Sequence, residues 1–296
     1  MQRKRLLIIG CGDVALRAAK ILQGRYRLFG LVRHADKAAE LRSLGIVPII
    51  GDLDKPVTLR RLAGIAELVL HTAPPPADGR KDSRTVNLLS RLGGRCMVPQ
   101  RLVYISTSGV YGDCHGELVP ETRPANPRSA RAIRRVDAEQ QLRRWARHNG
   151  VNVNLLRAPG IYAHNRLPLQ RLRAATPVLL AGEDSFTNHI HADDLARIAI
   201  AALHRGRPGR SYNAADDSHL KMGDYFDLLA DHFRIPRPPR VSLSAARAQL
   251  PASLLSFMEE SRRLTNVRVR KELRVRLTYP TAQSVLDTIA DGKAVA

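Results

Sequence analysis

Aromatic side chains are scarce in this chain of 296 residues, which has one tryptophan, seven tyrosines and five phenylalanines. Proteins that bind single-stranded nucleic acid stack bases on such side chains. Acidic residues are also few, 27 against 48 lysines and arginines, so the formal net charge is +21. The 40 arginines are spread along the whole chain, and such a charge predicts only non-specific attraction to phosphates. We therefore expect no nucleic-acid partner.

Cysteine is nearly absent as well, with Cys11, Cys96 and Cys114 far apart in the sequence. Their spacing fits neither a disulfide framework nor a zinc site, which indicates reduced thiols in a cytoplasmic protein. No apolar run is long enough to span a membrane, so we expect no membrane segment. The basic start, Met1–Arg5, resembles that of a signal peptide, but the apolar run after it ends at Gly10.

A Gly-x-Gly-x-x-Ala turn is present at residues 10–15, between an apolar run and an alanine-rich helical pattern. Gly10 permits a tight turn, and Gly12 lets the backbone approach a pyrophosphate, which the N-terminus of the following helix attracts. The pattern predicts a dinucleotide site that includes Cys11, Asp13 and Val14. The alternative is an ordinary glycine turn between core elements.

Strands and helices alternate through the first half, which predicts an α/β fold with a Rossmann-type doubly wound parallel sheet. The expected strands are Arg5–Ile9, Arg27–Val32, Ile46–Ile50, Glu67–His71, Leu102–Ser106 and Val151–Leu156. The expected helices are Asp13–Leu22, Ala35–Leu44, Pro56–Leu62, Ser83–Leu92 and Ser129–Asn149.

Shorter elements follow and predict a smaller C-terminal α/β substrate lobe. They comprise helices at Asp193–Leu203 and Met222–Phe233 and strands at His189–His191, Ser211–Asn213 and Arg274–Leu277. We divide the chain into an NAD(P)-binding domain over residues 1–160 and a substrate lobe over 161–296, interleaved with the first. No flexible linker separates them, so we expect a wide interface with the cleft between the two.

Five further motifs follow the glycine turn in order. They are Asp52, His71-Thr72-Ala73, Tyr104–Gly112, Leu156–Tyr162 and His189–Ala196. Together with the turn, they resemble the extended short-chain dehydrogenase/reductase superfamily of the NAD-dependent epimerase/dehydratase type. The short glycine pattern is similar to the atypical branch of that superfamily. The resemblance implies that Asp52 contacts adenine, that Thr72 and Ala73 line the cofactor, and that Thr107 orients a substrate hydroxyl.

The same resemblance implies a catalytic tyrosine and, four residues later, a lysine on the long helix after the fifth strand. Counting back from Ala138-Glu139, those positions hold Arg131 and Arg135. Arg135 could hold a ribose hydroxyl or a phosphate as the lysine does. Arg131 cannot replace the acid/base, because a guanidinium does not release its proton usefully.

Three residues near the fifth strand are candidates for the missing chemistry. Thr107 stands at the superfamily's Ser/Thr position, although a hydroxyl at a strand end can simply satisfy a backbone group. Tyr111 is a candidate acid/base, although in the superfamily this tyrosine is mainly structural. His115 is of the residue type that most often transfers protons in enzymes, but a loop histidine is usually only solvated. We take Thr107 and Tyr111 as the candidate catalytic residues.

The end of the second strand predicts which cofactor binds. An acidic residue there would bond the ribose 2′-hydroxyl of NAD, whereas an arginine accommodates the 2′-phosphate of NADP. Arg33 stands at this position, and no acidic residue occurs before Asp36. This favours NADP over NAD, unless Arg33 is one more surface arginine.

His189-x-His191 followed by Asp193-Asp194 has a pattern that could bind a metal, because two histidines on a strand share one face. The family resemblance explains the same residues without a metal: Asp193 would cap the next helix and His191 would pack at the lobe junction. No further histidine or cysteine cluster supports a metal site, so we expect none.

These observations predict an NAD(P)-binding oxidoreductase or epimerase/dehydratase-like protein with an atypical active site and a small-molecule substrate of unidentified class. The alternative is a non-catalytic NADP(H)-binding sensor or regulatory protein, favoured by Arg131 and Arg135. A homodimer is left open as the assembly.

Overall fold

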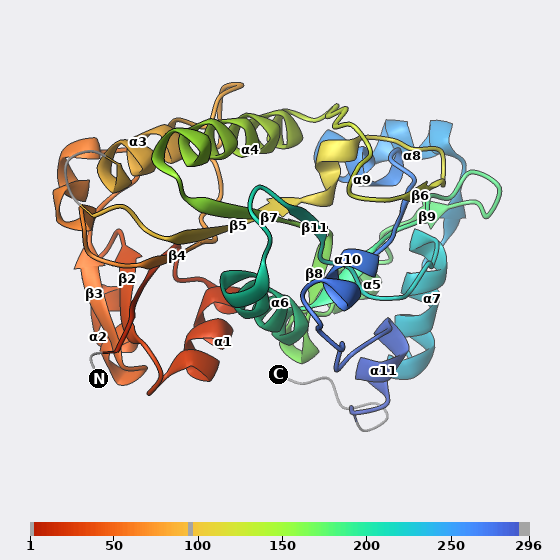
Figure 1. The fold of residues 1–296 in the computed structure, drawn as a ribbon. Coiled ribbons are helices and arrows are strands. Elements are labelled where there is room, and N and C mark those ends of the chain that lie inside the picture. The colour runs from red at the N-terminus through yellow and green to blue at the C-terminus, as the bar shows by residue number, and fades with distance from the viewer. Residues whose placement is uncertain (1–2, 94–96, 290–296) are drawn as a thin grey trace.

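The computed structural model describes residues 3–93 and 97–289, in which seven strands form one parallel sheet (Figure 1). The strand order is β11-β7-β5-β4-β1-β2-β3, so the chain winds outward in both directions from β1, as in a Rossmann fold. The strands are β1 (Arg5–Ile9), β2 (Arg27–Val32), β3 (Ile46–Ile50), β4 (Leu68–His71), β5 (Arg101–Thr107), β7 (Asn152–Ala158) and β11 (Ser211–Asn213). The expected fold class is confirmed.

Helices cover both faces of this sheet. Figure 1 shows α3 (Ser83–Leu92) and α4 (Ala130–Asn149) on one face, with α1 (Asp13–Leu22) and α6 (Ala192–Arg205) on the other. Alternate residues of β1 pack on opposite faces: Leu6 and Ile8 lie with α1 and α6, and Leu7 and Ile9 lie with α3 and α4. Burial on both faces explains why the central strands are continuous apolar runs rather than alternating ones.

Shorter elements complete the structure. Within the first half these are α2 (Asp36–Ser43), the 3₁₀ helices η1 (Pro56–Leu62) and η2 (Ser108–Tyr111), and β6 (Leu118–Val119). Beyond the sheet lie β8 (Gly160–Tyr162), η3 (His164–Arg166), α5 (Leu169–Arg173), β9 (Val178–Leu179), β10 (His189–His191), α7 (Met222–Phe233), β12 (Arg240–Val241), α8 (Leu243–Gln249), α9 (Ala252–Met258), β13 (Arg263–Leu264), α10 (Val267–Lys271) and α11 (Ala282–Leu286). None of the helices in the described ranges is long and apolar enough to cross a membrane.

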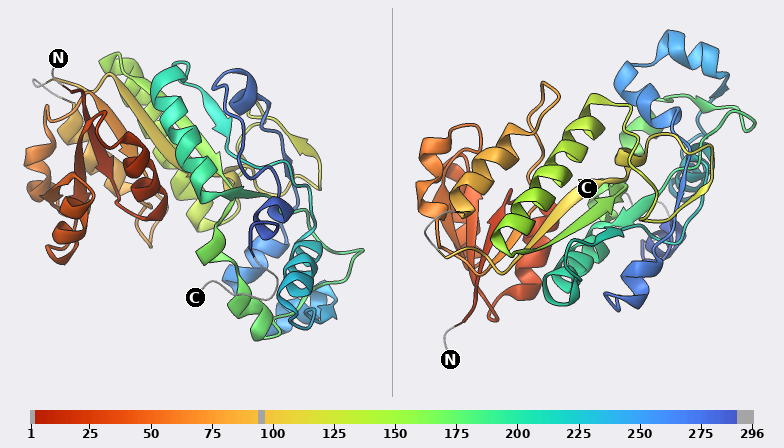
Figure 2. Two further views of the ribbon diagram at one scale, coloured as in Figure 1. Left: turned by 90° about the horizontal axis from the view of Figure 1, so that it is seen from below. Right: turned by 45° about the horizontal axis from the view of Figure 1, so that its top comes forward.

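The second half of the chain contributes to both lobes. A separate apolar cluster built on α7, β9 and α11 forms the core of the smaller lobe, which lies at one end of the sheet (Figure 2). However, β11 pairs with β7 and extends the main sheet, and α6 packs against α1. The chain beyond residue 160 therefore returns to the first lobe, and the two lobes are joined by shared elements rather than by a linker.

One expected strand is wrong. Arg274–Leu277 forms no strand, because Arg274 has a left-handed backbone with φ of 52°. The next backbone N–H groups, those of Thr278 and Tyr279, donate to the carboxylate of Asp194 at 2.8 Å each. The segment therefore docks on the start of α6 through one buried side chain, and its apolar alternation does not reflect strand pairing.

Candidate functional site

The glycine turn between β1 and α1 leaves a helix N-terminus open. Gly10 has φ of +86°, and a Cβ there would lie 2.6 Å from the backbone nitrogen of Ala73, so only glycine fits. Gly12 is the N-cap residue of α1 and provides no side-chain cap, and a Cβ built on it would contact nothing within 4 Å. The first N–H groups of α1 therefore face open space, which is the arrangement that holds a phosphate.

Cys11, inside this turn, packs against β2. The Cys11 thiol lies 3.7 Å from the carbonyl oxygen of Leu31, and burial, with the charge of Glu40, raises its pKa to about 12. A thiol of this kind packs and does not react. Val14 is buried but lines the cavity described below. Cys96 lies outside the described residues.

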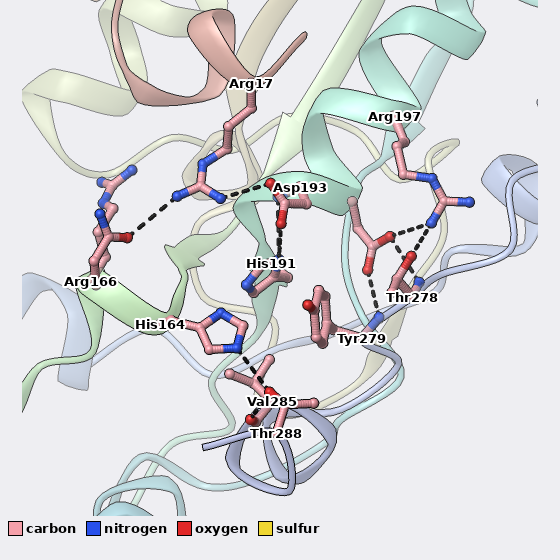
Figure 3. Close-up of polar contacts among 12 residues, drawn as sticks. Arg17, His164, Arg166, His191, Asp193, Arg197, Thr278, Tyr279, Val285 and Thr288 are labelled. Carbon is pink, nitrogen blue, oxygen red and sulfur yellow. Dashed lines mark hydrogen bonds and ion pairs between the residues drawn. The ribbon is translucent and has the colours of Figure 1, made fainter. Parts of the chain in front are cut away.

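Asp13 begins α1 and is held by two arginines. Its carboxylate accepts from Arg17 Nε at 2.9 Å and from Arg166 Nη1, in the smaller lobe, at 3.1 Å. Arg17 also donates to Asp193 Oδ1 at 2.7 Å, at the start of α6 (Figure 3). Burial raises the pKa of Asp13, but the hydrogen bonds from the two arginines outweigh it and the pKa is lowered. The negative charge of Asp13, beside the open N-terminus of α1, is thereby compensated.

The His-x-Asp-Asp segment caps α6 differently from the expectation. His191 is the N-cap residue, and its Nδ1 accepts from the backbone N–H of Asp193 at 3.2 Å. Asp193 therefore does not cap the helix, because α6 begins one residue earlier, at Ala192, than expected. The His191 ring is wholly buried and lies 4.0 Å from the ring of Tyr279, in agreement with packing at the lobe junction (Figure 3).

The histidines and aspartates of residues 189–194 are not grouped as metal ligands. The second histidine, His189, stacks on Tyr225 with ring centroids 4.0 Å apart and lines the cavity. Burial lowers the pKa of both His189 and His191 to about 4. Within residues 3–93 and 97–289, no group of three or more histidine, cysteine, aspartate or glutamate side chains is placed to hold a metal ion.

The predicted cofactor residues lie along the carboxyl edge of the sheet. Arg33 follows β2 and is exposed, and Asp52 follows β3, where its Oδ1 accepts from the backbone N–H of Asp54 at 3.0 Å. Thr72 follows β4, and its hydroxyl donates to the carbonyl oxygens of Ile9, at 3.2 Å, and Gly10. Parallel topology places these strand ends on the same edge as the open turn. Arg33 and Asp52 are not among the residues that line the main cavity.

Thr107 ends β5 and faces the cavity. Its Oγ1 accepts from the backbone N–H of Gly109 at 3.2 Å and so caps η2. The residue is half-buried and lines the cavity. Because a hydroxyl oxygen that accepts one bond still has its proton to donate, the structural role and a contact to substrate are compatible.

Arg131 and Arg135 both line the cavity from α4. Arg135 Nη1 donates to the hydroxyl of Tyr104 at 2.7 Å and to the carbonyl oxygen of Ile105 at 2.9 Å, which anchors it to β5. The Arg131 guanidinium lies over the ring of Phe257, 4.4 Å from its centroid. One turn of helix thus presents two cations to the cavity.

A buried ion pair sets the position of α4. Glu139 accepts from Arg157 Nη2 at 2.7 Å and from the hydroxyl of Ser106 at 2.7 Å, which ties α4 to β7 and β5. Glu139 and Arg157 are both buried. Since Glu139 lies four residues after Arg135, this pair holds the turn of α4 that presents Arg135.

Tyr111 and His115 are not brought to the cavity. Tyr111 is only 1% exposed, and its hydroxyl donates to Asn213 Oδ1 at 2.7 Å. Burial raises the pKa of its phenol, which opposes proton exchange near neutral pH. His115 is exposed on a loop, 3.0 Å from Asp113. The position of Tyr111 favours a structural role over the predicted acid/base role.

A cavity of about 680 Å³ joins the two lobes. It runs from Gly12 and Asp13 past Thr107 to side chains of the smaller lobe. Several of these carry no sequence motif, and sequence reasoning missed their role: Phe226, Phe257, Glu260 and Arg262. Arg171, another lining residue, stands in the sequence near Arg166 and Arg173, a group that could meet an anion, but arginine is too common in this chain for the sequence alone to select it.

Part of the chain is similar in sequence to a curated enzyme. The dTDP-glucose 4,6-dehydratase of Mycobacterium tuberculosis (strain ATCC 25618 / H37Rv) is 32% identical over 123 residues, which cover 38% of this chain and 37% of the dehydratase. The chain thus matches little more than a third of that relative's length.

Solved structures resemble the chain over nearly its whole length. A functionally unknown conserved protein from Silicibacter pomeroyi DSS has a TM-score of 0.81 and 29% identity, covering 96% of this chain and 97% of that one. DesIV, a dTDP-glucose 4,6-dehydratase from Streptomyces venezuelae with NAD and TYD bound, has a TM-score of 0.77 and 20% identity, covering 96% and 95%.

The sequence profile of one family matches residues 17–215. This range begins inside α1 and ends just after β11, and it includes the whole carboxyl edge of the sheet beyond β1 together with Thr107, Arg131 and Arg135. The protein therefore belongs to the NAD dependent epimerase/dehydratase family.

Proposed function

We propose that this protein is an NADP(H)-dependent oxidoreductase whose substrate lies in the cavity between the lobes, with its reacting oxygen against Thr107. The observation that carries the proposal is the continuity of that cavity, which connects the open N-terminus of α1 with the end of β5. NADP(H), when bound, would supply or accept hydride at the nicotinamide. Thr107 would donate its hydroxyl proton to the substrate oxygen and fix its orientation.

The residues present fit a dinucleotide. Gly12 leaves space for a pyrophosphate at the free N–H groups of α1, and Asp52 would meet the adenine. Arg33 forms no hydrogen bond or ion pair with another side chain in the part of the chain that the structure describes. A free guanidinium at the end of β2 supports NADP over NAD, because it can bond a 2′-phosphate bidentately.

The atypical part of the proposal concerns α4. We place Arg131 and Arg135 where the related enzymes have their tyrosine and lysine. Arg135 would retain the positioning role, because its anchoring to Tyr104 and Ile105 leaves other guanidinium N–H groups for a ribose hydroxyl. Arg131 would bind and orient, but it would not transfer a proton.

The proton would then be exchanged with another lining group. His189 lines the cavity, and its lowered pKa of about 4 keeps the imidazole neutral near pH 7, but the same burial makes it a weak proton acceptor. If no lining group exchanges the proton, the protein is instead a non-catalytic NADP(H)-binding sensor or regulatory protein. The presence of Arg131 in the cavity also favours this alternative.

Cofactor selectivity tests the first half of the proposal. Fluorescence titration of NADPH and NADH compares the parent protein with Arg33→Asp. Loss of a charge-assisted phosphate contact should weaken NADPH about ten- to a hundredfold and leave NADH nearly unchanged. Arg42→Asp, an equal charge change on the exposed end of α2, is the control. An unaltered NADPH/NADH ratio in Arg33→Asp would remove the NADP preference.

Measurement of turnover tests the second half of the proposal, which concerns the residues of α4. With UDP-glucose and dTDP-glucose, the parent protein should show no robust turnover, because Arg131 supplies no acid/base. The double substitution Arg131→Tyr with Arg135→Lys should raise turnover, since a general acid/base typically contributes about 10²–10⁴-fold. Ordinary turnover by the parent protein would contradict the assignment of α4. Cofactor binding without turnover of any alcohol or carbonyl substrate would support the sensor.

A further inference from the structure

The amino edge of the sheet, opposite the edge that carries the glycine turn, begins with arginines. All strands of a parallel sheet start at one edge, so their first residues lie side by side. Arg5 begins β1, Arg27 begins β2 and Arg101 begins β5. Arg5 and Arg27 are direct partners in the register of β1 and β2, and Arg101 is the partner of Leu68 at the start of β4. Three of the four neighbouring strands β2, β1, β4 and β5 therefore start with a cation.

Further cations surround the end of α6, which lies at the same edge. Partial burial lowers the pKa of the His204 imidazole, and so do four nearby positive charges, those of Arg205, Arg101, Lys4 and Arg25. These four residues come from four separate segments of the chain. The parallel topology thus brings together charges that are far apart in the sequence.

A hollow of about 330 Å³ opens on this edge between the starts of β1 and β2. Its lining comprises Arg3, Arg5, Tyr26, Arg27, Leu28 and Gly45. The ring of Tyr26 lies 5.9 Å from that of His204, centroid to centroid, so the hollow is continuous with the cations around α6. We call this region the amino-edge surface and define it by Arg3, Lys4, Arg5, Arg25, Arg27, Arg101 and Arg205.

The amino-edge surface has little negative charge to balance it. Arg5 pairs with Glu67 at 2.8 Å, whereas the other six cations form no ion pair within residues 3–93 and 97–289. Arg101 donates to the carbonyl oxygen of Gly206 at 3.0 Å, and the side chains of Arg25 and Arg27 are exposed. Cations held close together without counter-charges create a positive potential that attracts an anion with several charges.

We propose that the amino-edge surface binds the phosphate backbone of a nucleic acid without reading its sequence. Six of its seven cations are arginines, whose guanidinium groups match two oxygens of one phosphate. From β2 to β5 the edge spans about 14 Å, three strand spacings, which corresponds to about four successive phosphates of one strand. The sequence-based expectation of no nucleic-acid partner relied on arginines spread along the chain, and the fold gathers seven of the cations at one edge.

Scarcity of aromatic residues does not oppose this kind of binding, because contacts to the backbone need no stacked bases. None of the seven residues lines the main cavity, so the amino-edge surface is separate from the cofactor and substrate positions. The inference therefore goes beyond the proposed function and does not depend on it.

Fluorescence anisotropy with labelled nucleic acids tests the surface. The probes are a fluorescein-labelled DNA duplex and a single-stranded RNA of the same length, each in two unrelated sequences, titrated with the full chain. We expect at least one probe to bind, equally in both sequences, with a log affinity that falls linearly as log salt rises. Binding of the duplex alone would identify DNA as the partner, and binding of the single strand alone would identify RNA.

Two triple variants with the same net charge locate the binding. The first combines Arg25→Gln, Arg27→Gln and Arg205→Gln on the amino-edge surface. The control combines Arg173→Gln, Arg234→Gln and Arg276→Gln, three exposed arginines on α5, after α7 and after α10. The first variant should bind about tenfold or more weakly at low salt and have a salt slope reduced by about 2–3. The control should bind like the parent, and both should keep the parent's Tm because the replaced side chains are exposed.

Several results would overturn the inference. If neither probe binds at low salt, the surface does not bind nucleic acid. If the control variant is weakened as much as the first, total charge and not the amino edge attracts the probe. If poly-glutamate at equal charge displaces the probe as well as unlabelled nucleic acid does, the surface suits an acidic protein instead. If NADPH displaces the probe, the phosphates occupy the cofactor position.

Discussion

Gly10 and Gly12 stand two residues apart in one turn but are needed for different reasons. Gly10 is required by the fold, because its positive φ and the nearby backbone of Ala73 leave no room for a Cβ. Gly12 has an extended backbone and an empty space in front of it, so the fold tolerates a side chain there. If the proposed function holds, a requirement for glycine at Gly12 comes from the ligand and not from the fold.

The two substitutions should therefore separate stability from binding. Gly10→Ala should lower the free energy of unfolding by about 1–3 kcal/mol, from backbone strain and the close contact with Ala73. Gly12→Val should fold nearly as well as the parent protein but lose NADPH affinity, because a branched side chain fills the phosphate position. Denaturant unfolding and cofactor fluorescence measure the two effects. Equal NADPH affinity in Gly12→Val and the parent would contradict the phosphate-turn assignment.

Tyr111 provides a second prediction for a single residue. Its hydroxyl donates to Asn213, whose amide in turn donates to the carbonyl oxygens of Val119 and Thr265. Tyr111→Phe leaves Asn213 Oδ1 without that partner and should cost about 1–3 kcal/mol of stability. NADPH affinity and any turnover should be unaffected. Loss of turnover at unchanged stability would show that Tyr111 is the acid/base after all.

At the scale of elements, the start of α6 joins three parts of the molecule. Asp193 pairs with Arg17 of α1 (Figure 3), and Asp194 accepts hydrogen bonds from the backbone of residues 278–279. The two carboxylates are adjacent in sequence, but the Asp194 side chain is fully buried and that of Asp193 is 42% exposed. Neighbouring identical residues thus differ in how much the fold depends on them.

This difference is measurable. Asp194→Ala leaves two backbone N–H groups without an acceptor and should lower the free energy of unfolding by about 2–5 kcal/mol. Asp193→Ala breaks a partly exposed ion pair and should cost about 1 kcal/mol or less. Chemical denaturation of both variants gives the comparison. Equal losses would mean that Asp194 does not anchor the segment after α10.

For the whole molecule, buried histidines predict a loss of stability in acid. Burial lowers the pKa of His71 to about 3 and those of His189 and His191 to about 4. Between the ordinary value of 6.5 and these values, the unfolded chain binds protons that the folded chain does not. Stability contributed by these groups is therefore full above about pH 6.5 and falls as the pH is lowered toward 4.

His71→Gln isolates one of these contributions. One pKa unit is worth about 1.4 kcal/mol. Protonation of His71 in the unfolded chain therefore lowers the free energy of unfolding by about 3 kcal/mol at pH 4 relative to pH 7. Unfolding free energies across this range should fall less steeply in the variant than in the parent. His148→Gln, on the exposed face of α4, is the control. Because burial raises the pKa of Asp216 to about 7 and acts in the opposite sense, the difference between variant and parent is the quantity to measure. Parallel curves would contradict the prediction.

Much of the fold could be predicted because its signals are local. The apolar run before Gly10, the turn and the alanine-rich helix follow one another within 20 residues, and α3, α7 and β11 have the predicted bounds. One local apolar pattern gave a wrong prediction. Arg274–Leu277 alternates like a strand, but the backbone after it donates to Asp194, 84 residues away in sequence. Such a partner leaves no trace in the local pattern.

The sequence by itself determined the strand–turn–helix with its open helix N-terminus, the order of motifs along the carboxyl edge of the sheet, and the arginines at residues 131 and 135. Those features depend on spacing along the chain, which the sequence states directly. Tertiary structure decided that Tyr111 turns toward Asn213 and away from the cavity, and that His191 caps α6. It also decided the surroundings of Arg171, one of 40 arginines. The packing of α5 on α7 buries its guanidinium beside Phe226 without an acceptor. Burial and the absence of a partner are properties of three-dimensional neighbours, which no single sequence position encodes.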